Sequence, residues 1–120
     1  MQFSVHYDQQ HGYITAKFTG TLDGNTAQQC TNEIKKLSAE HHCKHLLIDV
    51  RDMKVDSVMD YYDLLRTFSD LGIDIAWRRV VLISKNQDGP DVFDTEQIGR
   101  GNSVKVCSDP KIALSWMNNR

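Results

Sequence analysis

Strand-like and helix-like residue patterns alternate along almost the whole of this 120-residue chain. Segment 3–7 alternates apolar and polar residues, segment 13–19 is rich in β-forming residues, and Gly12 lies in the short gap between them, so a hairpin is expected. Further strands are predicted at 45–50, 79–84 and 103–107, and helices at about 23–41, 57–72 and 91–100 and from 109 onward. Strands that alternate with helices are joined by right-handed parallel crossovers. The order β-β-α-β-α-β-α-β-α therefore predicts an α/β fold with a mixed, mostly parallel five-stranded sheet.

Each predicted helix has one apolar stripe and recognisable end signals. Asp23 is a good N-cap for the first helix, Asp56 or Ser57 caps the second, and Gly72 ends the second. Pro110 stands at the tolerated first position of the last helix. The stripes expected to face the core are Ala27, Cys30, Ile34 and Leu37 in the first helix, Val58, Tyr61, Tyr62, Leu65 and Phe68 in the second, and Ile112, Ala113 and Trp116 in the last.

Size and charge narrow the class of protein. At 13.7 kDa the chain is expected to form one domain over residues 1–120. Lys and Arg number 14 against 16 Asp and Glu, a net charge of −2, which argues against a nucleic-acid binder because little counterion release is available. The N-terminal residues lack the basic and apolar regions of a signal peptide, and no apolar run is long enough to span a membrane. An odd count of three cysteines then indicates reduced thiols and a cytoplasmic location.

No motif of a known enzyme class is present, so no catalytic residue, cofactor or metal is expected. The chain has no phosphate-binding glycine loop, no nucleophile elbow and no C-x-x-C pair. Segment 41–45 reads His-His-Cys-Lys-His, but its spacing fits no standard zinc motif, and surface polar residues explain it more simply. Asp56, Asp60 and Asp63 share a helix face at a spacing that suits acid–base chemistry, although helix capping and solvent exposure account for them more simply.

Three short motifs resemble the STAS family, the sulfate-transporter and anti-sigma-factor-antagonist domains. Residues 20–27, Gly-Thr-Leu-Asp-Gly-Asn-Thr-Ala, match the run that opens the first helix in that family. Residues 47–50 resemble its central strand, and Asp56-Ser57 stands where the family has a D-S-S-G-L turn. The resemblance is greatest to the SpoIIAA-like branch of small bacterial proteins, and it implies a single STAS-like domain.

The resemblance also implies a function. In the antagonist members a serine of the D-S-S-G-L turn is phosphorylated by a kinase, and the domain then changes its protein partner. Here Val58 stands at the usual acceptor position, so Ser57 is the phosphorylation candidate. The implied function is a non-enzymatic regulatory or protein-interaction module whose partner is a kinase or an anti-sigma-like regulator. Asp23, Asp56 and Ser57 form the expected binding face, because loops before helix N-termini gather at one end of an α/β sheet.

Charge around Ser57 works against phosphorylation. Asp49, Asp52, Asp56 and Asp60 lie near it in the sequence, and a phosphate adds nearly two more negative charges. The repulsion has to be compensated, either by a partner or by the arginines at 78 and 79.

Segment 73–77, Ile-Asp-Ile-Ala-Trp, is apolar although it lies between a helix and a strand. If it is exposed, Trp77 belongs to a docking patch for a partner, for a second copy in a homodimer or for a lipid. If it is buried, it covers an edge of the sheet. Trp77 with Tyr61, Tyr62 and Phe68 could also line a small apolar pocket. The alternative function is therefore a carrier of a small apolar ligand or lipid.

Overall fold

The computed structural model describes residues 2–54, 59–74, 76–84 and 104–118. In chain order the elements of this part are β1 (Gln2–Asp8), β2 (Tyr13–Thr21), α1 (Gly24–His41), β3 (His45–Lys54), α2 (Met59–Asp70), β4 (Arg78–Leu82), β5 (Val104–Cys107) and α4 (Pro110–Asn118). This order confirms the sequence-based prediction wherever the chain is described. The helix predicted at 91–100 lies outside the described residues.

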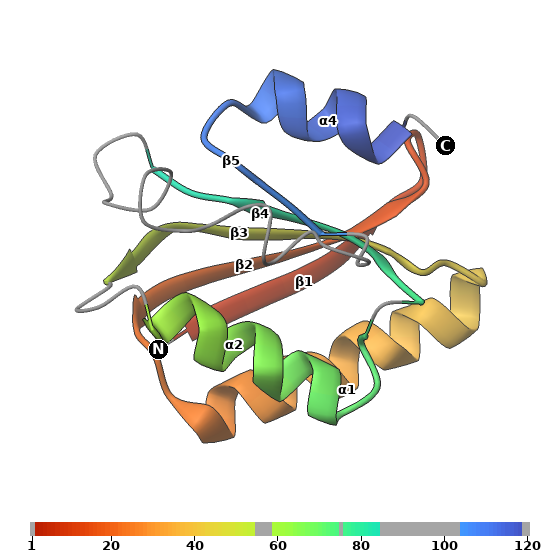
Figure 1. The fold of residues 1–120 in the computed structure, drawn as a ribbon. Helices are drawn as coiled ribbons and strands as arrows, with labels where there is room; N and C mark the ends of the chain where they lie inside the picture. The colour runs from red at the N-terminus through yellow and green to blue at the C-terminus, as the bar shows by residue number, and fades with distance from the viewer. Residues whose placement is uncertain (1, 55–58, 75, 85–103, 119–120) are drawn as a thin grey trace.

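The five strands form one sheet in the order β1-β2-β3-β4-β5. β1 pairs antiparallel with β2, and the other neighbours are parallel, as predicted. Helices α1 and α2 cover one face of the sheet and α4 covers the other (Figure 1). The parallel strands therefore define two edges. We call the edge where β2, β3, β4 and β5 end the carboxyl edge, and the edge where they begin the amino edge.

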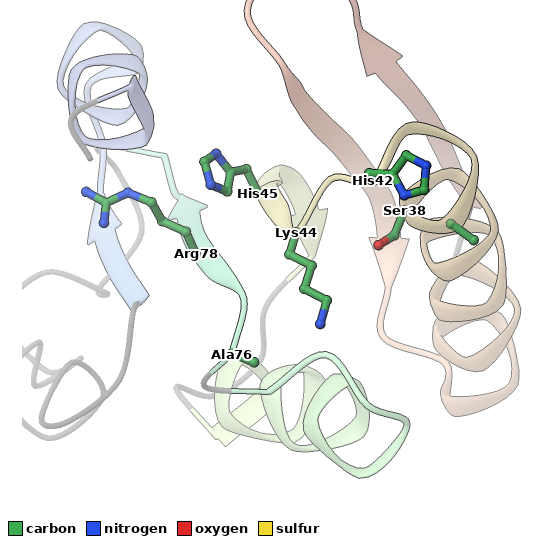
Figure 2. Close-up of a pocket in the computed structure, with 7 residues that line it drawn as sticks. Ser38, His42, Lys44, His45, Ala76 and Arg78 are labelled. Atoms are coloured by element: carbon green, nitrogen blue, oxygen red, sulfur yellow. The ribbon is translucent and has the colours of Figure 1, made fainter.

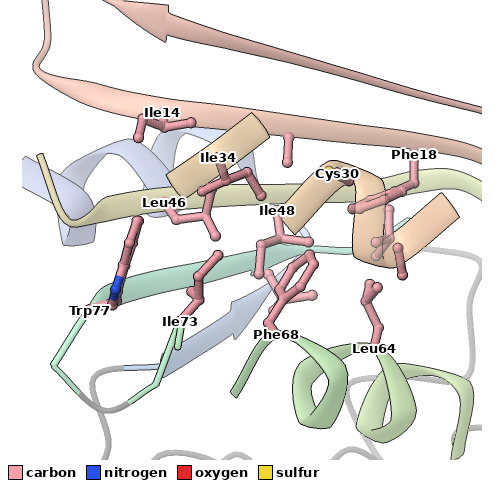
Figure 3. Packing of buried hydrophobic residues seen from close by; sticks show 14 of the residues in the cluster. Ile14, Phe18, Cys30, Ile34, Leu46, Ile48, Leu64, Phe68, Ile73 and Trp77 are labelled. Atoms are coloured by element: carbon pink, nitrogen blue, oxygen red, sulfur yellow. The ribbon is translucent and has the colours of Figure 1, made fainter. Parts of the chain in front are cut away.

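The larger core lies between the sheet and helices α1 and α2 (Figure 3). Alternate residues of β2 and β3 point into it, because successive side chains of a strand face opposite ways. Phe18 of β2 and Phe68 of α2 are fully buried, with ring centroids 6.1 Å apart. The stripe predicted for α1 is confirmed, with Leu37 only partly buried. In α2 the prediction omitted Leu64, which is buried one helical turn before Phe68.

A smaller core lies under α4 and joins Tyr13, Val80, Leu82, Ala113 and Met117. The prediction that Ile112 faces inward is wrong, because its side chain is 50% exposed. Ala113 and Met117, four residues apart, hold the buried stripe, and Trp116 packs beside them half-buried. Pro110 does begin the helix, and the carboxylate of Asp109 accepts a hydrogen bond from the backbone of Lys111 at 2.9 Å.

The pairing of β3 with β2 contains an irregularity near the carboxyl edge. Lys17 pairs with Asp49, but Thr19 pairs with Asp52, so β3 advances by three residues where β2 advances by two. Such a bulge shifts which side chains face the core. As a result Val50 and Met53 both lie in the larger core. The strand continues to Lys54, four residues beyond its predicted end.

Candidate functional site

Asp23 caps helix α1, as predicted. Its backbone is extended, its Oδ1 accepts a hydrogen bond from the backbone N–H of Asn25 at 3.0 Å, and its Oδ2 accepts one from the Thr26 hydroxyl at 3.1 Å. Asp23 is exposed and follows the end of β2, whose Thr21 pairs with Lys54 at the end of β3. Asp23 therefore lies at the carboxyl edge.

The other two residues of the expected binding face, Asp56 and Ser57, lie outside the described residues. In the sequence they stand between Lys54, the last residue of β3, and Met59, the first residue of α2. Of the predicted face, the structure thus places Asp23 alone.

Two carboxylates on β3 are already paired with cations. Asp49 is almost fully buried, and its carboxylate accepts hydrogen bonds from Nε, Nη2 and the backbone N–H of Arg51 at 3.0, 2.9 and 3.1 Å. Burial raises the pKa of Asp49, but the hydrogen bonds and charge of Arg51 outweigh burial and hold that pKa below its usual range. Asp52 forms an exposed ion pair with Lys17, with Nζ and Oδ2 3.3 Å apart. Much of the negative charge expected near the second helix is therefore neutralised within the chain.

Trp77 does not form part of an exposed patch. Its side chain is 4% exposed and packs in the larger core near Ile73 and Leu46 (Figure 3). Two alternatives were open for segment 73–77, an exposed patch or a buried segment that covers the sheet. The buried side chains of Ile73 and Trp77 agree with the second. Trp77 also immediately precedes β4, so it lies at the amino edge and not beside Asp23.

The two arginines expected to compensate a phosphate are committed elsewhere. Nε and Nη2 of Arg78 donate to the carbonyl oxygen of Trp116 at 3.0 and 2.6 Å, and its guanidinium lies 3.9 Å from the centroid of the Trp116 ring. Arg79 is buried, and its Nη1 donates to the carbonyl of Ile73 at 3.4 Å, while its Nε has no hydrogen-bond partner among the residues that the structure describes. Burial lowers the pKa of Arg79, and the charge of Asp74 opposes this only in part. Both arginines begin β4, so they lie at the amino edge.

The amino edge contains a cavity of about 740 Å³ (Figure 2). It is lined by Ser38, Ala39, His42, Lys44, His45, Ala76 and Arg78. Parallel pairing of β3 with β4 sets His45 opposite Arg78, and the backbone N–H of Arg78 donates to the carbonyl of Lys44 at 2.9 Å. A second cavity of about 180 Å³ shares three of these residues, His42, Lys44 and His45.

The basic residues of the larger cavity come from the His-His-Cys-Lys-His segment and from the start of β4. In the sequence the first segment resembled only a metal motif, and nothing connected it with Arg78. Among the described residues, no three His, Cys, Asp or Glu side chains are grouped so as to hold a metal ion. The predicted order of elements along the chain does not say which strands are neighbours. The observed pairing of β3 with β4 brings the two segments together, because adjacent parallel strands begin side by side.

The three cysteines are free thiols, and two of them are buried packing residues. Cys30 and Cys43 are buried and unpaired, and burial raises the pKa of the Cys30 thiol to about 12. Such a thiol stays protonated and is a poor nucleophile. Within the described residues, no helix has both the length and the apolar character needed to cross a membrane.

Solved structures share this fold. SpoIIAA, an anti-sigma factor antagonist in its unphosphorylated form, matches with a TM-score of 0.59 and 15% identity over 99% of this chain and all of that one. An anti-sigma factor antagonist from Mycobacterium paratuberculosis matches with a TM-score of 0.61 and 15% identity over 98% and 96% of the two chains. A DUF3478-family protein of Shewanella loihica, itself described as having a SpoIIAA-like fold, matches with a TM-score of 0.62 and 20% identity over 97% and 92%.

No protein-family model matches the sequence, and the comparison with curated proteins finds no match. The similarity of this chain to known proteins is therefore a similarity of fold. The chain is an α/β domain with a SpoIIAA-like fold, the fold that the short motifs at residues 20–27 and 47–50 predicted.

Proposed function

We propose that this protein is a non-enzymatic regulatory module of the cytoplasm that acts by binding another protein at the carboxyl edge. The observation that carries the proposal is the SpoIIAA-like fold, which matches two anti-sigma factor antagonists over nearly their whole length. The partner is a kinase or an anti-sigma-like regulator, and residues 1–120 act as one unit. Asp23, Asp56 and Ser57 form the binding face.

Phosphorylation of Ser57 governs that binding in our proposal. In the sequence Ser57 comes two residues before Met59, the first described residue of α2. A phosphate at a helix N-terminus meets free backbone amides and the positive end of the helix dipole. The charge objection is weaker than the sequence suggested, because Asp49 is paired with Arg51 and Asp52 with Lys17. These pairs leave less unbalanced negative charge to repel a phosphate.

The alternative function, a carrier of an apolar ligand or lipid, has no support. It required Trp77 to line a pocket, and Trp77 is buried in the larger core. Nothing in the described part of the chain favours a carrier.

The test has two stages. Protein purified from its native cells is first analysed by intact-mass and peptide mass spectrometry, and a phosphoryl group mapping to Ser57 is expected. Partners recovered with the wild type are then titrated against Ser57→Asp and Ser57→Ala.

Ser69→Asp is the matched control. Ser69 is exposed, and this substitution adds the same charge near the last residue of α2. We expect Ser57→Asp to change partner affinity while Ser57→Ala and Ser69→Asp bind as the wild type does. Equal affinity for all four folded proteins would rule out the phosphorylation switch. Failure to recover any specific partner would count against the interaction module itself.

A further inference from the structure

The cavity at the amino edge has an unusual concentration of cations for a chain of net charge −2. Lys44 and Arg78 carry permanent charges, and His42 and His45 add charge when protonated. The residues that line the cavity include no Asp or Glu. In the described part of the chain, none of the four ion pairs involves Lys44 or His42. The cavity is thus a local cationic region on a weakly acidic protein.

Cations near a helix C-terminus often serve only to balance its exposed carbonyls. Here one carbonyl at each of the two helix ends beside the cavity already has hydrogen-bond donors. The carbonyl of Ser38 in α1 accepts the backbone N–H groups of His42 and Cys43, and the carbonyl of Trp116 in α4 accepts two N–H groups of Arg78. None of these hydrogen bonds comes from the side chain of Lys44 or His42, so the capping that they provide does not account for those two cations.

The backbone presents these side chains in a defined way. His42 adopts the left-handed conformation, with φ of 51°, that ends α1 and turns the chain toward β3. Arg78 is held against Trp116 by two hydrogen bonds and by stacking. In Figure 2 the side chain of Lys44 extends between the end of α1 and Ala76. The walls of the cavity are thus set by the end of α1 and the starts of β3 and β4, whereas Lys44 itself is exposed and able to adjust.

We propose that this cavity binds the phosphate group of a small molecule. Lysine and histidine side chains with a serine hydroxyl are donor types that bind a phosphate, and Arg78 adds its positive charge although its Nε and Nη2 already donate to Trp116. The absence of lining carboxylates disfavours a cation. A volume of about 740 Å³ exceeds that of a phosphate alone, and it lies within the range of small-molecule sites. The remainder of the ligand contacts the wall near Ala39 and Ala76. This site is at the opposite edge from Asp23, so it is independent of the partner-binding face.

The test uses the full chain and inorganic pyrophosphate as the probe, titrated at low ionic strength by calorimetry and by amide NMR shifts, with acetate as a comparison anion. We expect saturable binding of pyrophosphate, with the largest shifts at His42, Lys44 and His45. Lys44→Gln should weaken binding by about tenfold, which corresponds to ~1.4 kcal/mol and to the loss of one charge-assisted hydrogen bond. His42→Asn should also weaken it, and asparagine tolerates the left-handed backbone at that position.

Lys111→Gln is the matched control. Lys111 is an exposed lysine in the first turn of α4, at the end of that helix away from Trp116, and its loss changes the net charge equally. Affinity for pyrophosphate should be unchanged in this variant. Equal weakening of pyrophosphate binding by Lys44→Gln and Lys111→Gln would mean that the anion is attracted by overall charge and would overturn the proposal. Equal affinity of the wild type for pyrophosphate and acetate would overturn it too.

A phosphate group can also come from a lipid headgroup. Vesicles of phosphatidylcholine with phosphatidic acid form the second arm of the experiment. Binding of these vesicles that depends on Lys44, without binding of free pyrophosphate, would assign the cavity to a lipid phosphate. Binding to neither probe would overturn the proposal.

Discussion

Replacing Asp23 with alanine tests whether this residue stabilises the fold by capping α1, separately from any role in binding. The substitution removes one acceptor from the backbone N–H of Asn25 and another from the Thr26 hydroxyl, both at an exposed helix end. Loss of an N-cap of this kind costs about 1 kcal/mol. Of this loss, roughly 0.3 kcal/mol or more comes from removing a negative charge at the positive end of the helix dipole.

Urea denaturation followed by far-ultraviolet circular dichroism measures this change. With a slope of roughly 1–3 kcal/mol per molar urea for a small protein, the midpoint of Asp23→Ala should fall by roughly 0.3–1 M at an unchanged slope. Asp23→Asn is the matched control, because asparagine is a good N-cap that retains an oxygen for Asn25 but has no charge. Its midpoint should lie closer to that of the wild type.

Two results would refute the reasoning. An unchanged midpoint for Asp23→Ala would show that the hydrogen bonds seen at the start of α1 contribute nothing to stability. An equal loss in Asp23→Asn and Asp23→Ala would show that the carboxylate charge, and not the cap geometry, is the stabilising feature. Partner binding that falls in both variants, beyond any loss of folded protein, would assign Asp23 to the binding face.

Two further predictions concern buried charges. Because Arg51 holds the folded pKa of Asp49 below its unfolded value, the pair stabilises the fold above about pH 4, and this contribution is lost as the pH falls through the lowered folded value. Asp49→Asn should therefore be less stable than the wild type near neutral pH and approach it at about pH 2 in urea titrations; a constant difference across that range would contradict the assignment. Arg79→Met removes a buried guanidinium whose Nε has no hydrogen-bond partner in the described part of the chain, so calorimetry should show an unchanged or higher unfolding temperature. A large decrease would mean that Arg79 has a stabilising role that its hydrogen bond to Ile73 does not explain.

The cavity at the amino edge could not be predicted from local sequence patterns. The His-His-Cys-Lys-His segment and Arg78 were each visible in the sequence, but more than thirty residues separate them. Their proximity follows from the parallel pairing of β3 with β4, which sets His45 opposite Arg78. The contact between Arg78 and Trp116 spans 38 residues in the same way. No periodicity within one element contains this information.

Local interactions determine what the sequence by itself could predict. The alternation of strands and helices, the cap at Asp23 and the stop at Gly72, whose φ is +105°, depend on residues within a few positions of one another. The buried stripe of α1 follows from the helical repeat and from the chain's need to cover one face of a sheet. For the same reason the SpoIIAA-like fold was predictable from short motifs and their order.

Tertiary structure decided which of the remaining polar and aromatic residues are accessible. Trp77 was equally compatible with a docking patch and with the core, and the close packing of Ile73 and Trp77 against the sheet placed it in the core. Ile112 was predicted to be buried, but the way α4 lies on the sheet buries Ala113 and Met117 instead. Burial depends on strand order, register and helix orientation, which bring together residues far apart in the chain, and these are properties of the folded molecule.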